Sequence, residues 1–282
     1  KTVVNFEGYN MFWVKLFSSV NDNIIFLHNN MQGEFEKRFP YLEQNFKCYK
    51  SYKKILSVSK QTNEENKKNL ASLYDIMENK FDFLENTINH DEIIEKSEEK
   101  LDKIVENRYF KKDYKVFMNI ARLSVEKDQA KLIQAFNVVN QKYPKTFLLI
   151  LGEGPLKEDL QNLVEKLNLK KNVFLLGRIS NPFPYLKKAD CFVMSSNYEG
   201  QGLVLLESLV LKKPIVSTNF SCVYDVLKDR GGLIVDNSIK GLVYGMEQYL
   251  LNKIERKHFD GVEYNNAVLY KLDEIFKGIN NE

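Results

Sequence analysis

The chain has 282 residues, of which 44% are hydrophobic and 28% are charged, and its formal net charge is +3. This composition is typical of a folded globular protein and not of a disordered chain, and the length fits two domains. No stretch approaches the roughly 18 continuous apolar residues of a membrane-spanning helix, and no signal peptide is recognisable, so any membrane contact is expected to be peripheral.

Lysine pairs are spread along the chain and form no basic run interleaved with aromatic residues, so nucleic-acid binding is not expected. Their charge is compatible with a weak attraction to an anionic membrane surface. Cys48, Cys191 and Cys222 are odd in number and lack the spacing of metal ligands. They predict reduced thiols, and hence a cytoplasmic protein that can lie at the inner face of the membrane.

The first 113 residues alternate strand-like and helical segments. Strand-like runs cover residues 1–6, 23–28, 54–59 and 81–84, and helical patterns cover residues 11–20, 35–46 and 64–73. Residues 91–106 are strongly charged with few apolar positions, which predicts an exposed linker helix. We therefore expect a first domain with a linker helix in residues 1–113.

From residue 114 onwards the alternation is regular. Apolar strands are predicted at residues 116–120, 147–151, 173–176, 191–194, 214–217 and 233–235, and helices at residues 130–143, 156–167, 203–211 and 239–251. Alternating strands and helices predict a doubly wound parallel sheet that is covered on both faces. We place this α/β domain at residues 114–260 and a C-terminal helix in residues 261–282.

The stretch from residue 194 to residue 207 joins an apolar strand to an apolar helix through a polar turn. Gly200 and Gly202 allow a ligand to approach the main chain, and the N–H groups that begin the helix suit a phosphate. Glu199 and Glu207 bracket this anion site, and Glu207 lies roughly 7.5 Å along the axis from the helix start if the helix starts near Gly202. The stretch predicts a site for a long polyhydroxylated anion; alternatively, both acids are solvated and the glycines only shape a loop.

The first strand of the second domain runs into a loop that carries Arg122 and Lys127. The arginine fork and the lysine charge can neutralise a leaving diphosphate without a metal, although both residue types are also common in plain surface loops. Arg178 and Ile179 follow the third strand at the same edge, where main-chain groups suit a nucleobase. The Gly152-Glu153-Gly154 turn is interpreted as structural.

In the first domain, His28 ends a strand at the edge where open α/β sheets bind ligands, but a structural histidine is the commoner case at such a position. No metal-ligand motif and no Walker loop is present. Ser195 and Ser196 lack the Gly-x-Ser-x-Gly elbow of a hydrolase. We therefore predict neither a metal site nor hydrolase chemistry.

The order of these motifs resembles that of the retaining glycosyltransferases of family four, which have the two-domain GT-B fold. Residues 121–123 with Lys127 are similar to the family's Gly-Arg-Leu…Lys loop, and Glu199 with Glu207 is similar to its Glu-x7-Glu motif. Further similarities lie at residues 27–30, 86–89, 152–155, 177–178 and 189–190. The resemblance implies two Rossmann-like domains, the first of them truncated, because the family has a further stretch before the position of residue 1. A partner chain that supplies this portion is one expectation.

The family transfers a sugar from a nucleotide diphosphate sugar, here expected to be a UDP-sugar, to an acceptor hydroxyl with retention of configuration. By resemblance, Arg122 and Lys127 stabilise the departing diphosphate and Glu207 holds the ribose. Glu199 and the amides near Gly202 and Leu203 would hold the donor sugar, and His28 would approach from the facing domain. We take Glu199 and His28 as catalytic. The remaining donor-site residues implied by the resemblance are Gly200, Gln201, Gly202, Leu203, Arg178 and Ile179.

The resulting expectation is a metal-independent, retaining hexosyltransferase of cell-surface glycan or glycoconjugate synthesis that needs no cofactor. Its acceptor would be a glycan, a lipid-linked sugar or a protein. The alternative is a noncatalytic subunit that binds a nucleotide sugar or acts as a scaffold. Another GT-B enzyme, an epimerase or a phosphorylase, is disfavoured because no cofactor-lysine signature is recognisable.

Overall fold

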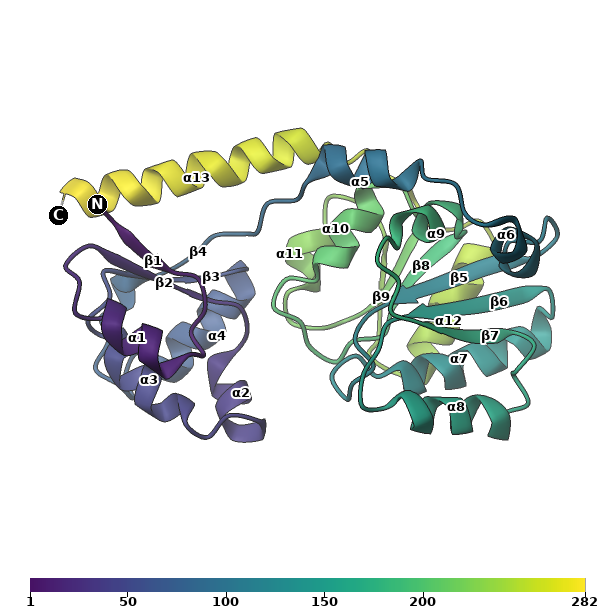
Figure 1. The fold of residues 1–282 in the computed structure, drawn as a ribbon, viewed down its shortest axis with the longest axis horizontal. Helices are drawn as coiled ribbons and strands as arrows, with labels where there is room; N and C mark the ends of the chain where they lie inside the picture. The colour runs from purple at the N-terminus through teal and green to yellow at the C-terminus, as the bar shows by residue number, and fades with distance from the viewer. Residues whose placement is uncertain (282) are drawn as a thin grey trace. The chain divides into compact units, whose positions relative to one another are not determined.

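The computed structural model describes residues 1–281, which divide into two compact units (Figure 1). The N-terminal unit comprises residues 1–87 together with the C-terminal helix α13 (Gly261–Asn281) from its second residue onwards, and the C-terminal unit comprises residues 88–261. The expected boundary near residue 113 and the separate C-terminal helix both differ from this division. Helix α13 joins the N-terminal unit because the hydroxyl of Tyr264 donates to the carbonyl of Asn86, at 2.8 Å.

The N-terminal unit contains a parallel sheet of four strands in the order β1-β2-β3-β4. Buried aromatic residues of α3 and of the turn after it form much of the core, among them Phe46, Tyr49 and Tyr52. The elements are β1 (Val3–Asn5), α1 (Met11–Phe17), β2 (Asn23–Leu27), α2 (Met31–Lys37), α3 (Leu42–Tyr49), β3 (Lys54–Ser57), α4 (Lys60–Leu70), the 3-10 helix η1 (Glu78–Lys80) and β4 (Phe81–Phe83).

The predicted helix over residues 35–46 is two helices, α2 and α3. Pro40 explains the interruption, because proline lacks the N–H that an inner helical turn needs and disfavours helical angles at the preceding residue. Helix α4 begins four residues before the predicted start at residue 64, since the side chain of Ser59 accepts the N–H of Thr62 as an N-cap.

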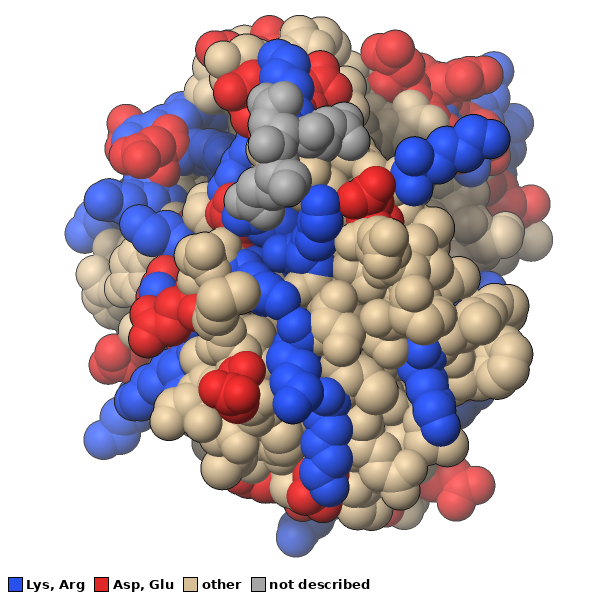
Figure 2. Space-filling model, turned by 90° about the vertical axis from the view of Figure 1, so that its left-hand side faces the viewer, with Lys and Arg blue, Asp and Glu red and all other residues tan. Residues whose placement is uncertain are grey.

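Several lysines lie where the strands of this sheet begin, and Figure 2 shows Lys and Arg side chains across that face of the molecule. The ammonium group of Lys53 pairs with Asp22, at 3.0 Å, and also donates to the carbonyl of Ile279 in the last turn of α13, at 3.2 Å. Cations are favourable at this end of a helix dipole. These contacts tie the C-terminal helix to the start of β3.

The C-terminal unit contains a parallel sheet of six strands in the order β10-β9-β8-β5-β6-β7. The strands are β5 (Lys115–Ile120), β6 (Thr146–Leu151), β7 (Val173–Gly177), β8 (Cys191–Met194), β9 (Ile215–Thr218) and β10 (Leu233–Val235). The helices are α5 (His90–Ser97), α6 (Lys103–Tyr109), α7 (Gln129–Lys142), α8 (Lys157–Lys166), α9 (Phe183–Lys188), α10 (Leu203–Val210), α11 (Val223–Leu227) and α12 (Ile239–Leu250).

Helices cover both faces of this sheet, as the alternating pattern predicts. Helices α7, α8 and α12 form one layer, and α5, α9, α10 and α11 form the other (Figure 1). The expected linker helix is divided into α5 and α6, and α5 packs against α9 and α10. The amide of Asn181 anchors it by donating to the carbonyl of Lys96, at 2.9 Å. The charged linker therefore belongs to the C-terminal unit.

Cys191 and Cys222 are buried and Cys48 is half-buried, and all three are free thiols. Across residues 1–281, no helix combines the length and the apolar content that crossing a bilayer requires.

Candidate functional site

The C-terminal sheet reverses its direction of winding between β5 and β8. These neighbouring strands pair through Phe117 and Cys191, while β6 lies on the other side of β5. Open α/β sheets bind ligands outside the carboxyl ends of the strands at such a switch point. The loop after β5 carries Arg122 and Lys127, and the loop after β8 carries Glu199, so the structure brings these three predicted residues to one edge.

Hydrogen bonds join the two loops into one frame. The main-chain N–H of Asn197 donates to the carbonyl of Glu126, at 2.8 Å. The hydroxyl of Ser195 donates to the carbonyl of Lys127, at 2.7 Å, and the Asn197 amide donates to the carboxylate of Asp128, at 3.2 Å. Because these contacts span about 70 positions of sequence, they fix the cationic loop against the acidic loop.

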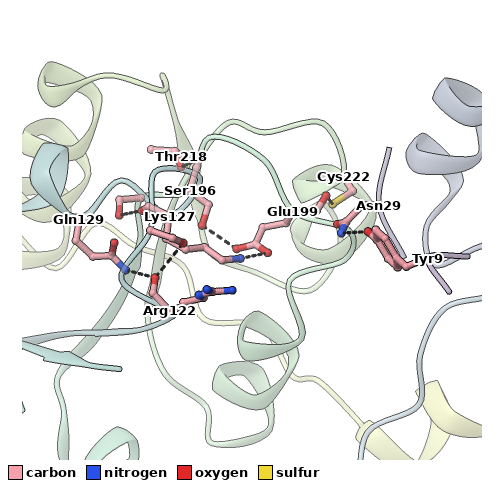
Figure 3. Close-up of polar contacts among 11 residues, drawn as sticks. Tyr9, Asn29, Arg122, Lys127, Gln129, Ser196, Glu199, Thr218 and Cys222 are labelled. Carbon is pink, nitrogen blue, oxygen red and sulfur yellow. Dashed lines mark hydrogen bonds and ion pairs between the residues drawn. The ribbon is translucent and has the colours of Figure 1, made fainter. Parts of the chain in front are cut away.

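At the centre of this frame, Lys127 and Glu199 form an ion pair of 2.5 Å (Figure 3). Their side chains are only 20% and 12% exposed, so solvent screens the pair weakly. The hydroxyl of Ser196 donates to the other carboxylate oxygen of Glu199, at 2.7 Å, and Thr218 in turn donates to the carbonyl of Ser196. The carboxylate of Glu199 is thus held in one orientation at the carboxyl edge between β5 and β8.

Arg122 presents an exposed guanidinium beside this ion pair (Figure 3). Its carbonyl accepts a hydrogen bond from the buried amide of Gln129, at 3.0 Å, which fixes the main chain below the side chain. Within residues 1–281, no carboxylate forms an ion pair with Arg122. Since Glu199 already neutralises Lys127, Arg122 supplies the uncompensated positive charge at the site.

The first turn of α10 adds main-chain donors. Gly202 is the N-cap residue with a φ of 79°, and no side chain caps the helix. Over the described part of the chain, no acceptor binds the N–H groups of Leu203 and Val204. Together with the helix dipole, such N–H groups favour an anion.

Glu207 lies one turn further along α10 and is half-buried. Burial raises the pKa of its carboxyl group, because the charged form loses solvation. No hydrogen-bond donor and no cation contacts this carboxylate in the described structure. A partly buried carboxylate without a donor is a suitable acceptor for ligand hydroxyl groups.

The Gly152-Glu153-Gly154 turn has the structural role expected for it. A Cβ at Gly152 would lie 1.9 Å from the carbonyl oxygen of Ala121, and a Cβ at Gly154 would lie 2.2 Å from that of Leu123. The turn can therefore pack directly against the main chain that carries Arg122. Its contacts include a hydrogen bond of 3.0 Å from the N–H of Leu123 to the carbonyl of Glu153.

We predict that Gly152→Ala destabilises the protein by roughly 2–4 kcal/mol, because its φ of 143° and the backbone clash both oppose a side chain. Gly278→Ala in α13 is the matched control, since a Cβ there meets nothing within 4 Å. Urea unfolding of both variants measures the difference. Equal stability of the two variants would contradict the packing described for the turn.

The remaining predicted donor-site residues lie in two places. Gln201 is buried at 4% exposure in the turn before α10, beside Gly200. Gly200 is not among the residues with positive φ, so only Gly202 uses the conformational freedom expected of both glycines. Arg178 and Ile179 follow β7, which β6 separates from β5. They thus lie at the same carboxyl edge as Arg122, but two strands away.

His28 belongs to the N-terminal unit, where it follows β2. Its Nε2 lies 2.6 Å from the carbonyl oxygen of Phe6, and its ring packs against the Phe6 ring at 5.2 Å. Nearby, Asn29 donates to the hydroxyl of Tyr9, at 2.8 Å (Figure 3), and burial raises the pKa of Tyr9 to about 12. His28 therefore has a local structural partner within its own unit.

Sequence reasoning did not assign roles to Ser196, Thr218 and Gln129, which orient Glu199 and the Arg122 main chain. Their partners come from distant segments, so no local spacing marks them. In the part of the chain that the structure describes, no group of three or more His, Cys, Asp or Glu side chains could hold a metal ion.

Solved structures share this fold. An Anabaena HepE structure in complex with UDP and glucose matches with a TM-score of 0.72 at 14% identity, covering 94% of this chain and 76% of that one. The structure of WaaG, described as a glycosyltransferase involved in lipopolysaccharide biosynthesis, matches with a TM-score of 0.68 at 16% identity, covering 89% and 69%. These neighbours are GT-B glycosyltransferases, and the two parallel sheets are consistent with the two Rossmann-like domains of that fold.

Two curated relatives extend the comparison. An uncharacterized glycosyltransferase of Methanocaldococcus jannaschii is 38% identical over 207 residues, which are 73% of this chain and 50% of the relative. The poly(ribitol-phosphate) α-N-acetylglucosaminyltransferase of Staphylococcus aureus is 29% identical over 169 residues, covering 58% and 34%. The chain thus spans half the length of the first relative and a third of the second. The model of the family described as "Glycosyl transferases group 1" matches residues 100–264, and the chain belongs to this family.

Proposed function

We propose that the C-terminal unit binds the donor of a retaining glycosyltransferase, and that this donor is a UDP-sugar. The whole protein would move the sugar to an acceptor hydroxyl in cell-surface glycan or glycoconjugate synthesis, without a metal. The observation that carries the proposal is the arrangement along α10. Arg122 and the uncapped N-terminus of α10 follow neighbouring strands at the same carboxyl edge of the sheet, and the unpaired carboxylate of Glu207 lies one turn further along α10.

In this proposal, each part of the site meets one part of the donor. Arg122 and the N–H groups of Leu203 and Val204 receive the diphosphate, whose negative charge grows as the sugar leaves. Glu207 accepts hydrogen bonds from the ribose hydroxyls, and Glu199 lies toward the sugar. The bond between the sugar C1 and the β-phosphate oxygen breaks, and the diphosphate leaves with the bonding electron pair. The acceptor oxygen bonds to C1, and its proton passes to the departing diphosphate or to solvent.

The comparisons support the donor and the pathway only by likeness. The HepE structure contains UDP and glucose, and the Staphylococcus aureus relative is named for transfer to poly(ribitol-phosphate). The bound ligands and the acceptor are properties of those two proteins. What favours a UDP-sugar here is that a neighbour of the same fold holds UDP and that this chain has a site suited to a nucleoside diphosphate.

Hydrolysis of UDP-glucose and UDP-N-acetylglucosamine by the chain, with a chelator present, tests the proposal. Water then replaces the acceptor, and proton NMR follows the anomer that is released first. We expect release of the α-anomer from an α-linked donor. Release of the β-anomer would contradict retention, and activity that requires added metal would contradict metal independence. Tight UDP binding without any turnover would favour the noncatalytic nucleotide-sugar-binding subunit.

We predict that Glu199→Gln lowers this hydrolysis at least about tenfold while it changes UDP affinity by less than about threefold. Glu199 is oriented by Lys127 and Ser196, and its position suits the donor sugar better than the nucleotide. Steady-state kinetics and calorimetry measure the two effects. If the variant instead melts at a much lower temperature and loses UDP binding, the ion pair is chiefly structural.

A further inference from the structure

A pocket lies at the amino edge of the C-terminal sheet, opposite the edge that carries Arg122. Lys213 stands two residues before β9, and Gly231 and Gly232 directly precede β10, so they mark the amino ends of parallel strands. The carboxyl ends of the same strands form the edge with Arg122. The pocket has a volume of about 270 Å³ and also involves residues 255–258.

Cations dominate the lining of this pocket. They are Lys212, Lys213, Arg230, Arg256 and Lys257, beside the imidazole of His258, whereas Glu255 is the one acid in the described lining. Two of these cations already have partners. The ammonium group of Lys213 donates to the carbonyl of Ala189, at 2.8 Å, and Arg230 donates to the carbonyl of Asp225 in α11, at 2.9 Å.

Three cations remain without a counter-ion. No carboxylate forms an ion pair with Lys212, Arg256 or Lys257 anywhere in residues 1–281. Burial lowers the pKa of the neighbouring Lys213 to about 8; Asp190 opposes this change, and the charge of Arg256 adds to it. The lining of the pocket therefore carries more positive charge than its own residues neutralise.

Gly231 allows the segment that carries Arg256 and Lys257 to approach the main chain closely. Gly231 has a φ of 94° and forms an antiparallel bridge with Arg256. A Cβ at Gly231 would lie 3.0 Å from the main-chain nitrogen of Lys257. The segment with Arg256 and Lys257 can therefore lie directly against the start of β10, where it lines the same pocket as Lys212.

We propose that this pocket binds a small multivalent anion of the phosphate class, either a free phosphate or pyrophosphate or a phosphomonoester. Guanidinium and ammonium groups together are suited to phosphate oxygens. The volume lies below the roughly 300–1,000 Å³ typical of pockets for larger ligands, which favours a small anion over a nucleotide sugar. The inference does not rest on the proposed transferase function, because the pocket lies at the other edge of the sheet.

Titration of the full chain with pyrophosphate, followed by amide NMR and by calorimetry, tests the site. We expect the amide signals of Gly231, Gly232 and Lys257 to shift. The double variant Arg256→Ala/Lys257→Ala should bind at this site about tenfold more weakly or worse. Lys240→Ala, which removes an exposed lysine of α12 outside the pocket, should leave the affinity within about twofold.

Pyrophosphate can also occupy the edge with Arg122, so the titration is repeated with Arg122→Ala. The shifts at Gly231 and Gly232 should persist in that variant. Glycerol 3-phosphate in place of pyrophosphate separates a phosphomonoester site from a site for free phosphate. Shifts confined to residues 121–128 and 200–204, or an affinity that the double variant leaves unchanged while its melting temperature is normal, would overturn the proposal.

Discussion

Replacement of Arg122 by alanine is expected to weaken UDP binding by about 1.5–3 kcal/mol, the range for a hydrogen bond to a charged group. This corresponds to a loss of roughly 10- to 100-fold in affinity. The reason is that Glu199 already neutralises Lys127, which leaves Arg122 as the uncompensated cation at the carboxyl edge where α10 begins. Isothermal titration calorimetry with UDP measures the effect.

Two further variants sharpen this test. Arg122→Lys keeps the charge but loses the planar fork, so it should retain part of the affinity. Arg108→Ala is the matched control and should leave the affinity for UDP unchanged. Arg108 is likewise an exposed arginine, but it lies on α6 and contacts the rings of Tyr109 and Phe174. If the Arg122→Ala variant binds UDP as tightly as the unaltered chain, the diphosphate does not bind at this loop.

Glu207→Gln is expected to have two opposite effects. Burial raises the pKa of Glu207, so the folded protein holds its proton at a pH where the unfolded chain has lost it. The stability of the folded state therefore falls as pH rises from the ordinary carboxyl pKa through the raised one. Glutamine does not titrate, so the ligand-free variant should melt at a higher temperature than the unaltered protein at pH 7.

The same substitution should weaken UDP binding about tenfold, because hydrogen bonds from the ribose to a charged acceptor are lost. Thermal melting and calorimetry at pH 7 measure the two effects. Glu158→Gln is the control. Glu158 is an exposed acid in the first turn of α8, where a negative charge slightly stabilises the helix, so its replacement should slightly lower the melting temperature and leave the affinity for UDP unchanged. Lower stability together with unchanged UDP affinity would mean that Glu207 is structural.

The sequence predicts much of the C-terminal unit because its buried parallel strands are short apolar runs between helices. The carboxyl ends of such strands meet at one edge, so the convergence of Arg122, Lys127 and Glu199 follows from the order of the elements. The bond between Lys127 and Glu199 does not follow in this way. It joins residues 72 positions apart, and its geometry depends on how two loops pack.

The N-terminal unit is less predictable, and the reasons are local. The break between α2 and α3 follows from Pro40, which the helical pattern alone overlooks. The charge of the segment before β5 predicts an exposed linker, yet α5 packs on α9 and α10. The association of α13 with the first 87 residues depends on contacts such as that between Lys271 and Asp82, at 3.3 Å. Amphipathic periodicity shows that a helix has an apolar face but does not identify the surface that covers it.

Calorimetric titration of the chain with UDP, uridine, CDP and GDP, without added metal, tests the central claim most directly. That claim is that the carboxyl edge between β5 and β8 binds a nucleoside diphosphate. We predict that UDP binds, that uridine binds much more weakly because it lacks the diphosphate, and that Arg122→Ala reduces the difference between the two. Failure of every nucleoside diphosphate to bind the folded chain, or equal binding of UDP and uridine, would contradict the claim.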